Sequence, residues 1–98
     1  MMQDLLPKLA DYITALERGA STTSRAEERP EYQRRLAATA AMFVALHQGD
    51  RARLRELIEQ EEHGTGWGYL LGDAGAQAEA AFATFVTSAR VSGGMSAA

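Results

Sequence analysis

Four stretches of this sequence place their large apolar residues at intervals of three and four positions, the spacing that brings side chains onto one face of an α-helix. The strongest pattern runs over residues 5–18. Its apolar face consists of Leu5, Leu6, Leu9, Tyr12, Ile13 and Leu16. No stretch shows the alternation of apolar and polar residues that is typical of a half-buried β-strand. The periodicity therefore restricts the chain to all-α folds.

The ends of the first predicted helix follow from residues with known capping preferences. Asp4 is suited to the N-cap, and Pro7 lies within the first turn, where its missing N–H costs little. Gly19 is suited to the left-handed position that ends a helix. Residues 20–29 lack an apolar period, so we predict a connection there.

The second predicted helix, residues 31–48, follows Pro30 and carries no charged residue between positions 36 and 46. We assign to its inward face Tyr32, Leu36, Ala40, Phe43, Val44 and His47. Its opposite side has a face of small residues, Ala37, Ala38, Ala41 and Ala45. A helix that is apolar all round is usually buried all round. We therefore expect this helix to be central in the fold or shared with a second subunit.

The third and fourth predicted helices cover residues 51–63 and 73–90. Gly49 is suited to be the C-cap of the second helix, and Asp50 is suited to be the N-cap of the third. The third helix has a narrow apolar stripe, Leu54, Leu57 and Ile58. Asp73 is suited to cap the fourth helix, whose stripe is Ala74, Ala78, Ala81, Phe82, Phe85, Val86 and Ala89.

Together the four helices predict a small antiparallel four-helix bundle, or three core helices with the third helix docked across them. We expect residues 1–91 to form a single domain and residues 92–98 to be a disordered tail.

Composition excludes several classes of protein. The chain has no cysteine, so it has neither a disulfide nor a thiolate site. No apolar run approaches the roughly 20 residues that cross a bilayer, and no signal region is visible, so we expect a cytoplasmic protein with no membrane partner. Abundant arginine and alanine beside a single lysine favour a bacterial source.

Residues 63–72 hold four glycines and the only tryptophan, a composition that no regular helix favours. In one interpretation Gly66 and its neighbours let Trp67 and Tyr69 project as anchors for a partner. In the other the two rings close one end of the bundle core. A phosphate-binding loop is disfavoured, because no strand precedes the glycines and no Lys-Ser or Lys-Thr pair follows them.

The two histidines do not form a recognisable catalytic or metal motif. His63 lies near Glu59 and Glu62, yet the Glu-x-x-His pattern of di-iron bundles is absent because position 60 is Gln. We therefore expect no metal, no cofactor and no catalytic residue. His47 lies within the apolar stripe of the second helix, where a hydrogen-bonded core histidine or a cation at the helix C-terminus is the ordinary interpretation.

Basic residues around the Gly49 corner resemble the outline of a helix-turn-helix motif. They are Arg34, Arg35, Arg51, Arg53 and Arg55. The third helix becomes acidic after them and the net charge is −3, so neutralisation of phosphates would be weak. A solvated face or an acidic protein partner is the better interpretation.

We expect from the sequence a non-enzymatic interaction protein of the accessory, inhibitor or immunity type. Two contact surfaces are predicted, the 63–72 turn with His63, Gly66, Trp67 and Tyr69, and the alanine face, which would make a homodimer. The first alternative is a ligand-binding or catalytic bundle whose pocket is walled by Trp67, Tyr69, His47 and His63. The second alternative is nucleic-acid binding through the arginine-rich corner.

Overall fold

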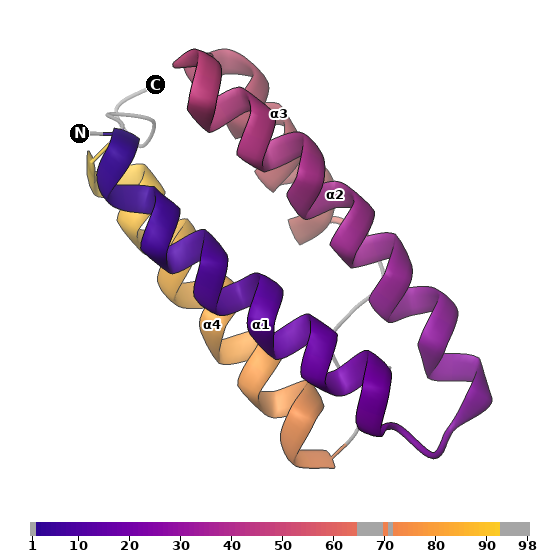
Figure 1. The fold of residues 1–98 in the computed structure, drawn as a ribbon. Helices are drawn as coiled ribbons and strands as arrows, with labels where there is room; N and C mark the ends of the chain where they lie inside the picture. Colours follow the sequence, from indigo (N-terminus) through magenta and orange to yellow (C-terminus); the bar gives the residue numbers. More distant parts are fainter. Residues whose placement is uncertain (1, 65–69, 71, 93–98) are drawn as a thin grey trace.

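A computed structural model describes residues 2–64, 70 and 72–92 of the chain. Within this part the protein is an all-α four-helix bundle without strands, as the periodicity predicts (Figure 1). The elements are η1 (Met2–Leu5), α1 (Leu6–Thr22), η2 (Ala26–Glu28), α2 (Arg29–Gln48), α3 (Arg51–Glu62) and α4 (Gly72–Ser92). The prediction for the 92–98 tail falls almost wholly outside the described residues.

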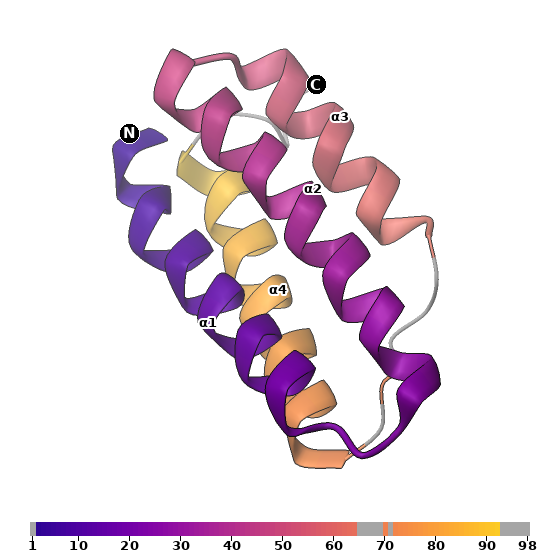
Figure 2. The same ribbon diagram turned by 45° about the vertical axis from the view of Figure 1, so that its right-hand side comes forward.

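Helix α1 packs against both α4 and α2, and α3 packs along α2 (Figures 1 and 2). Leu9, Tyr12 and Leu16 bring the predicted apolar face of α1 into the core, where the Tyr12 ring contacts the Phe82 ring of α4 at a centroid distance of 5.2 Å. The stripes predicted for α3 and α4 also face inward. Their buried members are Leu54, Leu57, Ile58, Ala78, Phe82, Phe85, Val86 and Ala89. The assignment of Phe82 to the core is confirmed.

The corner between α2 and α3 has the predicted capping residues. Gly49 adopts a left-handed conformation with φ of 69°, and its N–H donates to the carbonyl oxygen of Leu46 at 3.1 Å. The Asp50 carboxylate accepts a hydrogen bond from the backbone N–H of Arg53 at 3.0 Å, which caps α3.

Both capping residues predicted for the first helix are wrong, although its predicted start lies within one residue of the observed one. Leu5 occupies the N-cap position instead of Asp4, because the turn η1 precedes α1. Gly19 does not end the helix, which continues to Thr22. A Cβ atom at position 19 would lie 2.3 Å from the ring of Tyr32. The glycine is therefore required because α1 and α2 approach each other closely at this point.

The inward face predicted for the second helix is correct at Tyr32, which is buried, and in part at Leu36, which packs against the core, but it is wrong at the other four positions. Its supposed core residue Phe43 is 49% exposed, Val44 is 51% exposed, and Ala40 and His47 also face solvent. The buried residues of α2 are Glu31, Tyr32, Arg35, Thr39, Met42, Ala45 and Leu46. Helix α2 carries apolar side chains on all of its sides, so its sequence pattern does not indicate which side is buried.

No helix among the described residues combines the length and the apolar character that crossing a bilayer requires.

Candidate functional site

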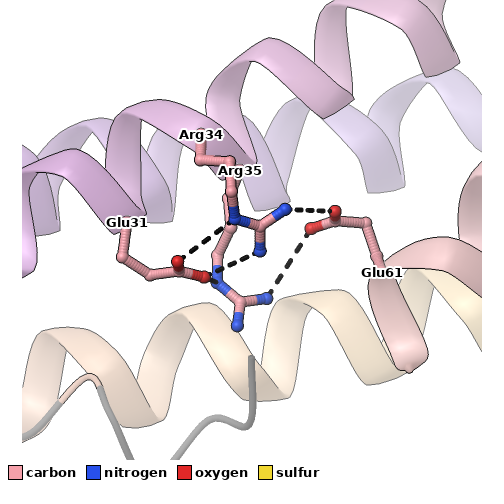
Figure 3. Close-up of polar contacts among 4 residues, drawn as sticks. All are labelled: Glu31, Arg34, Arg35 and Glu61. Atoms are coloured by element: carbon pink, nitrogen blue, oxygen red, sulfur yellow. Dashed lines mark hydrogen bonds and ion pairs between the residues drawn. The ribbon is translucent and has the colours of Figure 1, made fainter. Parts of the chain in front are cut away.

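Four charged side chains from α2 and α3 form a compact cluster inside the bundle, the buried charge cluster Glu31, Arg34, Arg35 and Glu61 (Figure 3). The guanidinium group of Arg34 donates two hydrogen bonds to the Glu31 carboxylate, at 3.1 and 2.8 Å, and one to Glu61 at 2.9 Å. Nε of Arg35 lies 2.7 Å from Oε2 of Glu31, and its Nη1 lies 3.7 Å from Oε1 of Glu61. Two cations and two anions thus balance each other.

Burial makes the pairing within this cluster obligatory. The Arg35 side chain is 0% exposed and Glu61 is 5% exposed, whereas Arg34 covers the cluster from the solvent side. Burial acts to raise the pKa of Glu31, but hydrogen bonds from Arg34 and the charge of Arg35 outweigh it, so the pKa lies below its usual value. A carboxylate held in this way is a poor proton acceptor at neutral pH. The cluster therefore links α2 to α3 through buried ion pairs.

The tyrosines beside the cluster also stay protonated. Burial raises the pKa of the Tyr12 phenol, although the neighbouring Arg35 acts in the opposite direction. Burial and the negative charge of Glu28 raise the pKa of Tyr32. Glu28 is itself held by the hydroxyl of Thr23 at 2.5 Å. Both phenols are therefore neutral at neutral pH.

Over residues 2–64, 70 and 72–92 no three histidine or acidic side chains are arranged to hold a metal ion. A surface groove of about 350 Å³ runs along α4 over Phe82 and Val86. At its rim Arg90 donates to Glu62 at 2.5 Å, so these two charges compensate each other within the protein.

The solvent side of α2 carries an uncharged surface that we call the α2 outer face. It consists of Gln33, Ala37, Ala40, Phe43, Val44 and His47, all exposed. The rings of Phe43 and His47 stack with centroids 6.4 Å apart and an interplanar angle of 7°. At 1.5 Å per residue the face extends about 21 Å along the helix. The face thus combines apolar side chains with the polar Gln33 and His47 on one helix.

Only one residue of the predicted alanine face belongs to this surface. Ala45 is 2% exposed and lies in the core, and Ala38 and Ala41 are half-buried. Ala37 is exposed. The four alanines therefore do not form a free face on α2.

The predicted site residues in the glycine-rich turn are placed only in part. His63 is exposed at the end of α3, and its backbone N–H donates to the carbonyl oxygen of Glu59 at 3.1 Å. Gly66, Trp67 and Tyr69 lie outside the described residues. His47 precedes α3 and His63 follows it, so the twelve residues of this helix separate the two imidazoles. The structure does not bring them into one pocket.

The arginine-rich corner divides into two separate groups. Arg34 and Arg35 lie roughly 21 Å along α2 from Gly49, within the buried charge cluster. The others, Arg51, Arg53 and Arg55, are exposed near the corner, where Arg53 is paired with Glu56. The five arginines do not make the continuous basic surface that a helix-turn-helix motif needs.

Sequence reasoning missed the burial of the charge cluster. One signal was present, because Glu61 falls three and four residues after Ile58 and Leu57 and so continues the apolar stripe of α3. A second signal was the spacing of Glu31 and Arg35, which permits an ion pair across one helical turn.

Comparison of the chain with protein-family models, with curated proteins and with solved structures yields no match. Geometry is therefore the basis for any proposal about function.

Proposed function

We propose that this chain is a small non-enzymatic interaction domain that binds a protein partner through the α2 outer face. The observation that carries the proposal is the exposure of about half of each of the adjacent side chains Phe43 and Val44 on an uncharged helix surface. A phenylalanine in this position has no role in the core of its own chain. Aromatic side chains at the centre of interfaces often contribute most of the binding energy.

The buried side of α2 supports the proposal because it holds the outer face rigid. Met42 and Leu46 pack in the core, while Arg35 is paired with carboxylates from α2 and α3. A partner would therefore meet a preformed surface, and little ordering of α2 would oppose binding. The partner is either a different protein or a second copy of this chain. The 63–72 turn stays a separate predicted contact surface.

The test compares variants of the outer face with a matched control. We would immobilise the parent protein, Phe43→Ala and Val91→Ala, and expose each to a lysate of the source cells and to the purified protein itself. Val91 is a suitable control because its side chain is 77% exposed and belongs to α4, not to the α2 outer face. Candidates would be purified, and their affinities for all three baits measured by calorimetry.

We expect a protein that binds the parent and Val91→Ala with equal affinity and binds Phe43→Ala about 30-fold more weakly, which corresponds to ~2 kcal/mol. Equal binding of every candidate to Phe43→Ala would refute the α2 outer face as the docking surface. Unfolding curves of the three baits would show that Phe43→Ala remains folded.

A further inference from the structure

A polar pocket lies at the end of the bundle where α1 ends and α4 begins, and both helices can be followed to this end in Figures 1 and 2. Its volume is about 350 Å³, which lies in the lower part of the range for ligand sites in proteins. It shares no residue with the α2 outer face. Polar side chains make up most of its lining, namely Thr23, Ser24, Arg25, Glu28, Tyr32 and Asp73.

The Tyr32 side chain brings to this pocket a hydroxyl group that lacks a partner. Only 1% of Tyr32 is exposed, yet over residues 2–64, 70 and 72–92 its hydroxyl forms no hydrogen bond. A Cβ atom at position 19 would lie 2.6 Å from the hydroxyl oxygen, so this oxygen lies beside Gly19. Thr23 lies one helical turn further, where its N–H donates to the carbonyl oxygen of Gly19 at 3.0 Å. The Tyr32 hydroxyl is thus directed toward the end of α1 that lines the pocket, and a bound molecule would supply its missing hydrogen bond.

The charges in the pocket favour a positively charged occupant. The Glu28 carboxylate is buried and already paired, because it accepts a hydrogen bond from Thr23 at 2.5 Å and lies 3.2 Å from Nε of Arg25. Asp73 adds a second carboxylate, which is exposed and forms no ion pair or hydrogen bond within the part of the chain that the structure describes. Two carboxylates and one guanidinium group give the lining a net charge of −1. Electrostatic complementarity therefore favours a cation over an anion.

The first turn of α4 does not reverse this preference. A helix N-terminus attracts anions through its free N–H groups and its positive dipole end. The first turn of α4 already carries the Asp73 carboxylate, which offsets that positive end. A bound anion would meet the like charges of Asp73 and Glu28, whereas a cation would meet the opposite charge of Asp73.

From these observations we propose that the pocket binds a small molecule that carries a primary ammonium group and an oxygen atom that accepts hydrogen bonds. The ammonium group pairs with the Asp73 carboxylate. The ligand oxygen accepts a hydrogen bond from the Tyr32 hydroxyl. The hydroxyl of Ser24 is exposed and has no partner among the described residues, so it is a further acceptor for the ammonium group. This site is independent of the function proposed for the α2 outer face.

Titration of the full chain with ethanolamine, followed through the chemical shifts of the backbone amides, tests the ligand class. Ethanolamine has a hydroxyl group and is a primary ammonium ion at neutral pH. Ethylene glycol and glycolate are the matched controls, because they carry a hydroxyl group and a carboxylate in place of the ammonium group. We expect ethanolamine to saturate the site with a Kd of about 1–10 mM, and each control to bind at least ~10-fold more weakly.

Three variants test whether ethanolamine binds in this pocket. Asp73→Asn should weaken binding about 10-fold, because it removes the charge that pairs with the ammonium group. Tyr32→Phe should weaken binding about 5-fold and leave the urea midpoint of unfolding unchanged, because the hydroxyl has no partner within the described chain. Glu79→Gln is the matched control, since it neutralises an exposed carboxylate of α4 outside the pocket, and it should bind ethanolamine as the parent does.

Contrary results would overturn the proposal in distinct ways. Chemical shifts that do not saturate up to about 100 mM ethanolamine would exclude a site for this ligand class. Equal or tighter binding of ethylene glycol would show that the ammonium group makes no favourable contact, and tighter binding of glycolate would show that the pocket prefers an anion. If Asp73→Asn and Tyr32→Phe both bind ethanolamine with the affinity of the parent, the ligand binds elsewhere on the protein.

Discussion

Removal of the Arg35 guanidinium group by Arg35→Met should strongly destabilise the fold, because it leaves buried carboxylates with one cation fewer. Glu31 would lose a contact of 2.7 Å and Glu61 one of 3.7 Å, and the cluster would change from neutral to a net charge of −1. Breaking one partner of a buried ion pair costs about 3–5 kcal/mol. Arg34 would still hydrogen-bond both carboxylates, and Met fills much of the vacated volume. We therefore expect a loss of about 3 kcal/mol.

Urea unfolding at neutral pH, followed by far-UV circular dichroism, would measure this loss. With a slope of about 1–3 kcal/mol per molar urea, the midpoint should fall by about 1–3 M. Arg53→Met is the matched control, because Arg53 makes an exposed ion pair with Glu56, and such pairs contribute about 0–1 kcal/mol. The control should unfold close to the parent.

A second substitution separates the charge effect from a packing effect. Glu61→Gln removes one buried negative charge, so in the Arg35→Met background it should restore neutrality and recover about 1–2 kcal/mol. In the parent the same change should destabilise the protein. The reasoning fails if Arg35→Met unfolds at the midpoint of Arg53→Met, or if Glu61→Gln costs as much in the variant as in the parent.

Three further predictions concern packing and protonation. Phe82→Ala should lower the free energy of unfolding by about 3–5 kcal/mol, whereas Phe43→Ala should change it by less than about 1 kcal/mol, and equal urea midpoints for the two would contradict their assigned burial. Gly19→Ala should destabilise by about 1–3 kcal/mol although alanine favours helices, because its Cβ overlaps the Tyr32 ring; a raised melting temperature would contradict the close approach of α1 and α2. The pKa of Glu31 is lower in the folded protein than in the unfolded chain. The ionised carboxylate therefore stabilises the fold fully at pH values above its pKa in the unfolded chain, and this stabilisation is lost as the pH falls through its pKa in the folded protein. Glu31→Gln should therefore be destabilised relative to the parent at pH near 7, with a smaller difference at about pH 2, and a difference that grows on acidification would contradict this sign.

The apolar pattern predicts a helix correctly in all four places, but it predicts the orientation of a helix only where one face is distinct. Leu9, Tyr12 and Leu16 recur at intervals of three and four residues on α1, and Phe82 and Phe85 do so on α4, so these faces follow from spacing. Helix α2 has apolar side chains around its circumference. Its orientation depends on pairing with Glu61, which lies on another helix and is remote in the sequence.

The ends of the helices could be predicted where they depend on neighbouring residues in the sequence, but not where they depend on contacts with another helix. Gly49 and Asp50 act through the backbone of their own turn, so their roles are visible in the sequence. Gly19 acts through its contact with Tyr32 on the next helix, which no local preference reveals. The candidate binding surface was not predicted because Phe43 and Met42 are adjacent and both apolar. The spacing of apolar residues does not decide which of these two side chains is buried.

Because Met42 and Phe43 are adjacent and both apolar, a turn of α2 by one residue would bury Phe43 in place of Met42. The energy landscape of such a helix has two nearby minima unless something separates them. The buried Arg35 provides the separation, because the turned helix would withdraw its guanidinium group from Glu31 and Glu61 and leave charges buried without partners. A sequence change inside the bundle can thus decide whether an aromatic ring is offered to other molecules or hidden from them. Mutational drift at position 35 would alter the surface of the protein without touching a surface residue.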